Sequence, residues 1–363
     1  MLVYIMAFFS TLLFSYLFMH ERKSRLVNVD RSSYLEFTTR KIKYIRSYVG
    51  ILFVCFVPII IMAIRYNVGT DYAGTYTIDF YLIKNGFNTR NEPLSSLLYW
   101  ISAQFCETPQ LFFALSSVIC VYLVYIGIFR TSVNPVQSIV LYFITYQYFT
   151  SMNGVRQMMA TSIVFLGLNI LLEKRYKKFA IVVCVAGLVH YAAFIYILLI
   201  PLMLFNLDFK KSFVSLMILI GGIYLFKEQL YALIELTPYS HYLVSSYSEY
   251  KTSLLFIVVN ILVYFIMGLF QIKHTRYRLL MNIQMVIIVT CMIQEVIPLA
   301  GRIVQLFSFY RILIIPEVAI AIDNGKDRQL FNWGIYGFYV LYCIYGLLTG
   351  WDSLLPYQTI FTK

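Results

Sequence analysis

Residues 111–129 read LFFALSSVICVYLVYIGIF, a run of nineteen residues without a charged side chain. A helix of that length rises about 28 Å, close to the roughly 30 Å hydrocarbon core of a membrane. Lipid offers no partner to exposed backbone N–H and C=O groups, so a helix is the expected structure. Similar runs recur from end to end of the chain. The expected spans lie near residues 2–19, 48–64, 111–129, 136–152, 157–173, 178–190, 192–206, 212–226, 252–272, 279–299, 303–322 and 331–350.

The composition agrees with lipid as the main solvent. Of 363 residues, 60% are hydrophobic and 13% are charged, whereas a soluble globular domain has about 25% charged residues. We therefore predict an all-α fold, a polytopic transmembrane helix bundle of about 11 to 12 spans. It would form a single integral membrane domain over residues 1–363, with no separate soluble domain. The 6 cysteines include no Cys-x-x-Cys pair, so neither a disulfide framework nor a zinc site is predicted.

The distribution of Lys and Arg predicts the orientation. The net charge of +12 comes mainly from short loops and forms no continuous basic surface, which indicates membrane topology and not nucleic-acid binding. The basic loops are residues 22–46, 174–178, 210–211, 273–278 and 326–328. They alternate along the chain only if the run 178–206 crosses twice, with a break around His190 and Tyr191. Both termini then face outward, as do two longer loops at 65–110 and 227–251. The first segment lacks a basic start and a cleavage site, so we interpret it as a retained helix.

Polar residues beside the apolar runs gather on the predicted outward side, where charge near lipid usually has a purpose. The first cluster, RYNVGTDY over residues 65–72, follows the second span. Its turn could present the carboxylate of Asp71, and Arg65 is either a functional cation or an anchor at the helix end. Tyr72, Tyr76 and Phe80 repeat at helical spacing. They suit an interfacial helix, and such an aromatic face could also stack on sugar rings.

The second cluster is Asn91-Glu92-Pro93. Proline at the first helical position, with a polar residue before it, is a strong helix start. Glu92 is therefore either a helix cap or a carboxylate held at the outer membrane surface. The sequence leaves both interpretations open.

The third cluster is NGVRQ over residues 153–157, at the predicted outward start of a span. The N–H groups of a helix N-terminus coincide there with the guanidinium of Arg156. Together they favour a phosphate or diphosphate. An arginine at a bilayer surface is common, but Asn153 and Gln157 beside it strengthen the functional interpretation.

Two further sites complete the set. His190 lies at the predicted break and is either a hydrogen-bonded structural residue or a general base. Arg302 opens the span 303–322 and is a candidate second phosphate ligand. Arg311 and Glu317 lie deeper in that span. They are six residues apart, so they do not share a helix face, and each needs another partner or an aqueous path.

As an ordered set these motifs resemble the EpsG family of Wzy-type polysaccharide polymerases. The resemblance extends over most of the chain. The matching features are RYNVGTDY at residues 65–72, Asn91-Glu92-Pro93, NGVRQ at 153–157, His190 with its small and aromatic neighbours, and R-I-x-x-x-F at 302–307. The family's usual aromatic pair at the end of the last motif is Leu306-Phe307 here, a departure from the pattern.

The resemblance implies a multi-pass enzyme of the bacterial cytoplasmic membrane whose active side is extracytoplasmic. It implies undecaprenyl-diphosphate-linked oligosaccharides as donor and acceptor, and a flippase and a chain-length regulator as protein partners. A lipid diphosphate is the leaving group, so cationic side chains suit it, and a base would take the acceptor hydroxyl proton. The expected cations are Arg65, Arg156 and Arg302, the candidate bases His190, Asp71 and Glu92, and the further substrate ligands Tyr72, Asn153 and Gln157. The sequence has no Asp-x-Asp motif and no P-loop, so we expect no nucleotide, cofactor or metal.

Three rival functions stay open at this level. A lipid-linked oligosaccharide flippase would need cationic groups along a passage accessible from both sides, whereas most candidates here gather on one side. A polysaccharide ligase would use the same lipid-diphosphate donor with another acceptor. A membrane acyltransferase would place its histidine beside an acyl-donor path. The sequence does not separate the polymerase from the ligase.

Overall fold

The chain is all-α, as predicted. The computed structural model describes residues 1–27, 44–89, 91–205, 208–236, 240, 252–270, 274–294 and 300–362. Over these residues the ordered elements are helices, and an isolated antiparallel bridge joins Arg65 to Thr359. Most of the basic loop at 22–46 lies outside the described residues, as do residues 237–239 and 241–251 of the second predicted outward loop.

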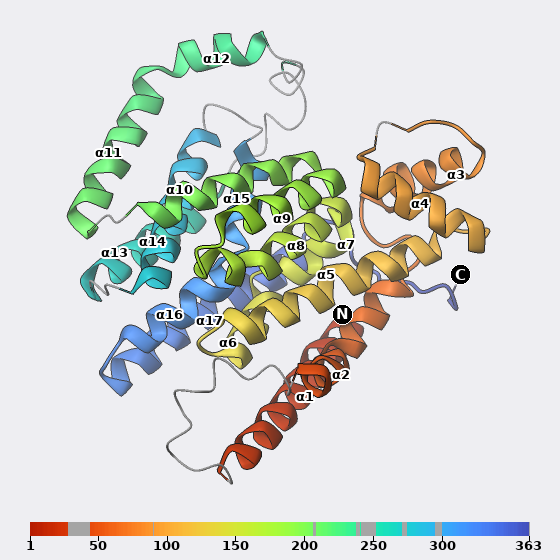
Figure 1. Ribbon diagram of the computed structural model, residues 1–363, viewed down its shortest axis with the longest axis horizontal. Helices are drawn as coiled ribbons and strands as arrows, with labels where there is room; N and C mark the ends of the chain where they lie inside the picture. Colours follow the sequence, from red (N-terminus) through yellow and green to blue (C-terminus); the bar gives the residue numbers. More distant parts are fainter. Residues whose placement is uncertain are drawn as a thin grey trace. The chain divides into compact units, whose positions relative to one another are not determined.

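Figure 1 shows the helices in chain order. Their bounds are α1 Leu2–Val27, α2 Tyr44–Ala63, the π-helix η4 Tyr72–Thr77, α3 Ile78–Lys84, α4 Pro93–Phe105, α5 Gln110–Thr131, α6 Pro135–Ile144, α7 Gln147–Asn153, α8 Val155–Leu172, α9 Tyr176–Val189, the 3₁₀-helix η5 Tyr191–Leu198, α10 Leu199–Leu204, α11 Phe209–Leu225, α12 Lys227–Glu235, α13 Leu254–Phe270, α14 Thr275–Gln294, α15 Ala300–Ser308, α16 Arg311–Ala321 and α17 Gly325–Leu348.

The described helices make this a multi-pass membrane protein. Five are long and apolar enough to cross a membrane: α1, through Leu2–Met19, and α5, α8, α14 and α17. Two bent pairs, α11 with α12 at 66° and α15 with α16 at 49°, raise the number to 7 if each pair is one span. Other predicted runs form shorter apolar helices. The predicted span 136–152 is divided into α6 and α7 because Tyr146 takes a left-handed conformation with φ 70°.

The predicted break at His190 is confirmed. Helix α9 ends at Val189, His190 lies outside the helices, and a 3₁₀-helix begins at Tyr191. The double crossing that we inferred from this break stays a prediction.

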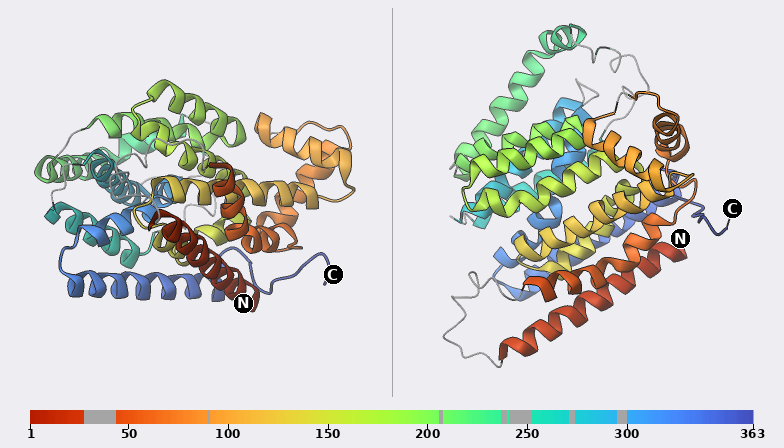
Figure 2. Two further views of the ribbon diagram at one scale, coloured as in Figure 1. Left: turned by 60° about the horizontal axis from the view of Figure 1, so that its bottom comes forward. Right: turned by 45° about the vertical axis from the view of Figure 1, so that its right-hand side comes forward.

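The chain divides into two compact units. The first comprises residues 1–169, 177–194 and 334–363, and the second comprises residues 170–176 and 195–333. In the first unit α2 packs along α5 and α1, and both views of Figure 2 show α1 and α2 side by side. Helices α3 and α4, which follow α2 and precede α5 in the sequence, form a hairpin. Both units contain candidate spans.

In the second unit α14 is the central helix, in contact with α10, α11, α13, α15 and α16. Its buried Gln284 donates to the side-chain oxygen of Asn260 on α13 at 3.0 Å.

The expectation that Arg311 and Glu317 need separate partners is confirmed. Glu317 forms an ion pair with Arg276 of α14, and the Arg311 guanidinium lies 4.4 Å from the centre of the Phe256 ring. Glu317 is therefore paired with a cation of another helix, and Arg311 makes a cation–π contact with another helix.

Helix α4 exposes apolar side chains and buries polar ones, which is the opposite of an amphipathic helix in a soluble protein. Its buried residues are Ser95, Tyr99 and Ser102, whereas Leu97 and Trp100 are 46% and 53% exposed. A helix with apolar side chains outside and serines inside is suited to lipid contact. Its 13 residues rise only about 20 Å, too short to cross the bilayer. We therefore expect α4 to lie within one leaflet.

The lipid contact of α4 can be tested through Trp100. Replacing the other two tryptophans, Trp333→Phe and Trp351→Phe, leaves Trp100 as the single indole. In vesicles, lipids brominated close to the headgroup should quench its fluorescence at least twofold more than lipids brominated at the chain end, because an interfacial helix lies near the headgroups. Strong quenching by aqueous iodide, with none by either lipid, would place α4 in water and contradict this prediction.

Candidate active site

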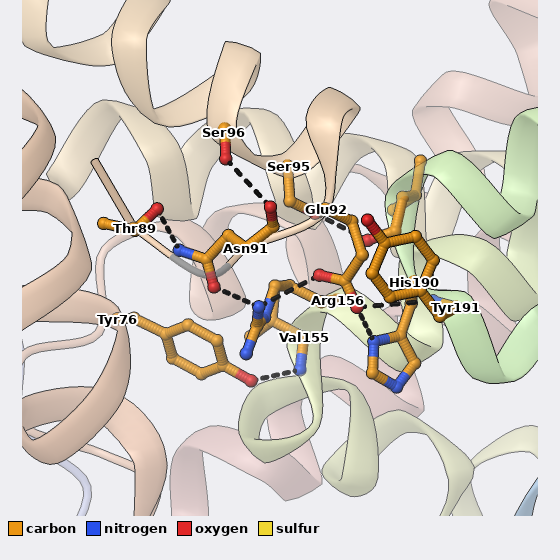
Figure 3. A network of polar contacts seen from close by, with 11 residues as sticks. Tyr76, Thr89, Asn91, Glu92, Ser95, Ser96, Val155, Arg156, His190 and Tyr191 are labelled. Carbon is orange, nitrogen blue, oxygen red and sulfur yellow. Dashed lines mark hydrogen bonds and ion pairs between the residues drawn. The ribbon is translucent and has the colours of Figure 1, made fainter. Parts of the chain in front are cut away.

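Glu92 is the centre of a polar cluster in the first unit (Figure 3). It is the N-cap residue of α4, yet its side chain makes no capping hydrogen bond. Instead Oε2 accepts from Nη1 of Arg156 at 3.0 Å, and Oε1 lies 2.7 Å from Nδ1 of His190. The backbone N–H of Tyr191 also donates to Oε1 at 3.3 Å. The carboxylate thus contacts two side chains that can carry a positive charge. Glu92 is an N-cap residue by its backbone position, but its side chain does not cap the helix.

Three elements far apart in the sequence supply this cluster. Glu92 comes from the start of α4, Arg156 from the first turn of α8, and His190 from the break after α9. Glu92 and Arg156 are 64 residues apart, and Glu92 and His190 are 98 apart. The cluster therefore exists only because these helices pack with their ends together.

The cluster is buried at its centre and partly open at its edges. The Glu92 side chain is 6% exposed, whereas those of Arg156 and His190 are 21% and 17% exposed. Asn91 accepts from Nη1 of Arg156 and donates to Thr89 at 3.1 Å, which holds the guanidinium from a second side. Figure 3 shows Nε2 of His190 on the side of the ring away from Glu92. Both basic side chains therefore keep polar atoms that can meet a ligand.

Opposing effects act on the pKa of the Glu92 carboxyl. Burial alone raises this pKa, but the hydrogen bond from His190 and the charges of His190 and Arg156 outweigh burial and lower it to about 2. Glu92 is consequently ionised throughout the neutral range. A carboxylate held in this way is a weak proton acceptor and a strong orienting group.

A second cluster is organised by Asn153, the last residue of α7. Its Oδ1 accepts from the Thr70 hydroxyl at 2.8 Å and from the Asp71 backbone N–H at 3.0 Å. Its Nδ2 donates to Oδ1 of Asp352 at 2.8 Å, and its backbone oxygen accepts from the Tyr76 hydroxyl at 2.6 Å. The predicted motifs at 65–72 and 153–157 are thus in contact, together with the residues after α17.

Tyr76 connects the two clusters. Its hydroxyl donates to the Asn153 carbonyl and accepts from the Val155 N–H at 2.9 Å. These two partners lie on either side of Gly154, where α7 ends and α8 begins. The hydroxyl therefore bridges the corner that starts α8 and places Arg156 in its first turn.

Arg65 and Tyr72 lie in the interior of the first unit. The Arg65 side chain is completely buried, with its guanidinium 4.6 Å from the centre of the Phe113 ring and Nη1 donating to the Met62 carbonyl at 3.1 Å. Its Nε and Nη2 have no hydrogen-bond partner among the described residues. Tyr72 stacks on the same Phe113 ring at 4.4 Å. The predicted contact of Arg65 and Tyr72 with substrate stays a prediction.

The other predicted residues have separate positions. Asp71 is half-buried and contributes its backbone N–H to the Asn153 cluster. Gln157 is buried on α8, one residue after Arg156. Arg302 lies on α15 in the second unit. Its contact with a diphosphate stays a prediction.

Sequence reasoning missed Asp352, which lies just beyond α17. A signal was present, because a carboxylate follows the last span on the predicted outward side. Poor solvation and the nearby charge of Asp71 raise the pKa of the Asp352 carboxyl to about 6, even though the hydrogen bond from Asn153 lowers it. Most of this carboxyl is still ionised at pH 7.

Fold and site together define a multi-pass membrane protein with a buried carboxylate, arginine and histidine cluster at helix ends. The model of the EpsG family matches residues 48–359, from the second helix to the segment after α17. The chain therefore belongs to the EpsG family, which supports a role like that of a polysaccharide polymerase. Searches of curated proteins and of solved structures gave no significant match.

Proposed function

We propose that the protein joins oligosaccharide repeat units linked to undecaprenyl diphosphate at the outer leaflet of the bacterial cytoplasmic membrane. The observation that carries the proposal is the contact of Glu92 with both Arg156 and His190. It provides a cation for a leaving diphosphate and an imidazole for a hydroxyl proton, the two requirements of glycosyl transfer from a lipid diphosphate.

The bond changes balance without a further reactant. The acceptor hydroxyl oxygen attacks the anomeric carbon of the donor glycan, and the bond from that carbon to the diphosphate oxygen breaks. Its electron pair leaves with undecaprenyl diphosphate. The hydroxyl proton passes to a base, and the acceptor glycan is longer by one donor chain.

Arg156 is suited to the leaving group. Its guanidinium is partly exposed and lies in the first turn of an 18-residue helix, where backbone N–H groups also point outward from the helix end. A diphosphate gains negative charge as the glycosidic bond breaks. Donors already oriented toward that charge stabilise the transition state more than the ground state.

His190 is suited to the proton. In the neutral imidazole whose Nδ1 donates to the ionised Glu92, Nε2 is the unprotonated ring nitrogen and can accept a proton. Glu92 then stabilises the imidazolium that forms. Of the three candidate bases, this geometry favours His190, with Glu92 as its orienting partner.

The proposed orientation is supported by the charge distribution. The α4 and α8 ends of the cluster are N-termini, and the α9 end is a C-terminus, so all three agree with the predicted outward side. The basic loops lie at the opposite ends of the predicted spans. A lipid-linked substrate in the outer leaflet would meet the cluster near the headgroups, beside α4.

The test uses purified protein in lipid vesicles with a synthetic undecaprenyl-diphosphate repeat unit and no nucleotide or metal. A ladder of products would support the polymerase. Transfer only to an acceptor that is not lipid-linked would favour the ligase, and movement of the lipid-linked sugar between leaflets without a ladder would favour the flippase. Arg175→Ala is the control, since Arg175 is about half-exposed in an ion pair with Glu173 and follows the C-terminal end of α8, whereas Arg156 lies in the first turn of that helix.

A further inference from the structure

The segment after α17 runs antiparallel to the segment after α2. Four backbone hydrogen bonds join these two segments. They run from Thr70 N to Asp352 O at 3.1 Å, from Gly69 N to Ser353 O at 3.2 Å, from Tyr66 N to Gln358 O at 3.0 Å and from Ile360 N to Ile64 O at 3.0 Å. We call residues 351–360 the tail strap. It lies directly against the RYNVGTDY motif at 65–72.

Two hydrogen bonds fasten the tail strap to α1 and α2. The Tyr4 hydroxyl donates to the Leu354 carbonyl at 2.9 Å, and the Tyr357 hydroxyl donates to the Ile61 carbonyl at 2.6 Å. Leu354 is almost fully buried. The strap is therefore part of the packed first unit.

The loop over residues 65–72 contacts the tail strap on one side, and on its opposite side it packs closely against α7. Gly69 has φ +106°, and a Cβ there would lie 3.0 Å from the backbone oxygen of Met152 on α7. The loop is thus held between the tail strap and the corner where α7 meets α8. A shift of the strap would move that corner as well.

The Asp352 side chain makes the connection specific. An ionised carboxylate only accepts hydrogen bonds, so it requires Asn153 to turn its amide nitrogen toward Asp352. The amide oxygen of Asn153 is then left for Thr70 and the Asp71 N–H. The reversed amide would place its oxygen against the Asp352 carboxylate oxygen, two acceptors, and its NH2 group against the Asp71 N–H, two donors. Asp352 and the Asp71 N–H thereby select the same orientation of Asn153, and Asp352 is the side chain that holds the amide nitrogen.

We propose that Asp352 is a positioning residue of the active site: through Asn153 it fixes the α7–α8 corner, and so the direction in which Arg156 meets the lipid diphosphate. The connection runs from Asp352 to Asn153, from the Asn153 carbonyl to Tyr76, and from Tyr76 to the Val155 N–H, one residue before Arg156. This inference rests on the proposed function for its activity readout only.

The test compares Asp352→Ala with Asp352→Asn in full-length protein in lipid vesicles. Alanine removes the acceptor, and we expect kcat for ladder formation to fall about 10- to 100-fold, the loss that misplacement of a catalytic group causes. Asparagine retains an acceptor oxygen for the Asn153 amide, so its kcat should lie within about threefold of the natural protein. Gln358→Ala is the matched control, because that side chain is exposed on the same strap.

A second readout is independent of activity. Hydrogen exchange of peptides covering residues 64–76 and 150–158 should become about tenfold faster in Asp352→Ala at both sites and stay unchanged in Asp352→Asn. If the natural protein forms no ladder, the proposed function fails while this readout still decides the positioning role. If Asp352→Ala does not fold, Asn153→Ala should reproduce the faster exchange, and combining it with Asp352→Asn should add nothing.

Two results would overturn the proposal. Unchanged exchange and unchanged kcat in Asp352→Ala would show that the corner holds without this carboxylate. A folded Asp352→Asn as inactive as Asp352→Ala would mean that the charge itself is used, which a positioning role does not require.

Discussion

Arg156→Ala is expected to lower kcat for ladder formation by about 100- to 1,000-fold, the usual loss when one oriented donor to a developing oxyanion is removed. Nη1 of Arg156 also contacts Asn91 and Glu92. The variant therefore removes the guanidinium from the buried Glu92 carboxylate, which keeps its contacts with His190 Nδ1 and the Tyr191 N–H. Thermal unfolding in detergent should show a loss of about 1–3 kcal/mol, in the range for a hydrogen bond to a buried charge.

Arg156→Lys separates charge from geometry. Lysine retains the positive charge but not the planar fork that reaches Asn91, Glu92 and a diphosphate together. We expect its kcat to lie between those of the natural protein and Arg156→Ala. Full activity of Arg156→Ala, with Arg175→Ala behaving identically, would remove Arg156 from the mechanism.

Much of the fold could be predicted because the solvent is lipid. Apolar runs such as 111–129 have to become helices, and α5 and α8 lie where the runs predicted them. The break at His190 was also predictable, since the run around it is too long for one span. The division between α6 and α7 was not, because the left-handed residue there is Tyr146 and no glycine or proline marks it.

The sequence pointed to the members of the Glu92 cluster, but it did not show which of them are in contact. A charged residue beside an apolar run needs a partner, and that rule singled out Glu92, Arg156 and His190. Which charge meets which depends on how α4, α8 and the end of α9 pack, and no local pattern encodes contacts across 64 or 98 residues.

Arg65 is a second residue whose contacts depend on distant parts of the chain, and here the expectation from its local sequence differs from its observed position. At the end of an apolar run, arginine usually extends to the membrane surface, but here its guanidinium is completely buried over Phe113. The burial results from the tail strap and α5, which cover the end of α2. A sequence window around residue 65 contains neither element.

Glu92→Gln is expected to lower kcat by about 100- to 10,000-fold, the range that a positioned acid or base contributes. Glutamine fills the same space and can still bond one neighbour, but it cannot stabilise the imidazolium that forms at His190. His190→Ala should cause a similar loss. The double variant should be little worse than either, because residues that act as one unit are strongly non-additive. Losses that multiply would show that Glu92 and His190 act separately.

The pH dependence gives Glu92 a further test. Its pKa in the folded protein is about 2, below the ordinary value of 4.5. The carboxylate therefore stabilises the fold above pH 4.5, and this contribution is lost as the pH falls from about 4.5 toward 2. Between pH 5 and 8 Glu92 does not change its charge, so a fall in kcat within that window belongs to another group. Such a fall in the natural protein, absent from the residual activity of His190→Ala, would identify the imidazole as the base that Glu92 orients.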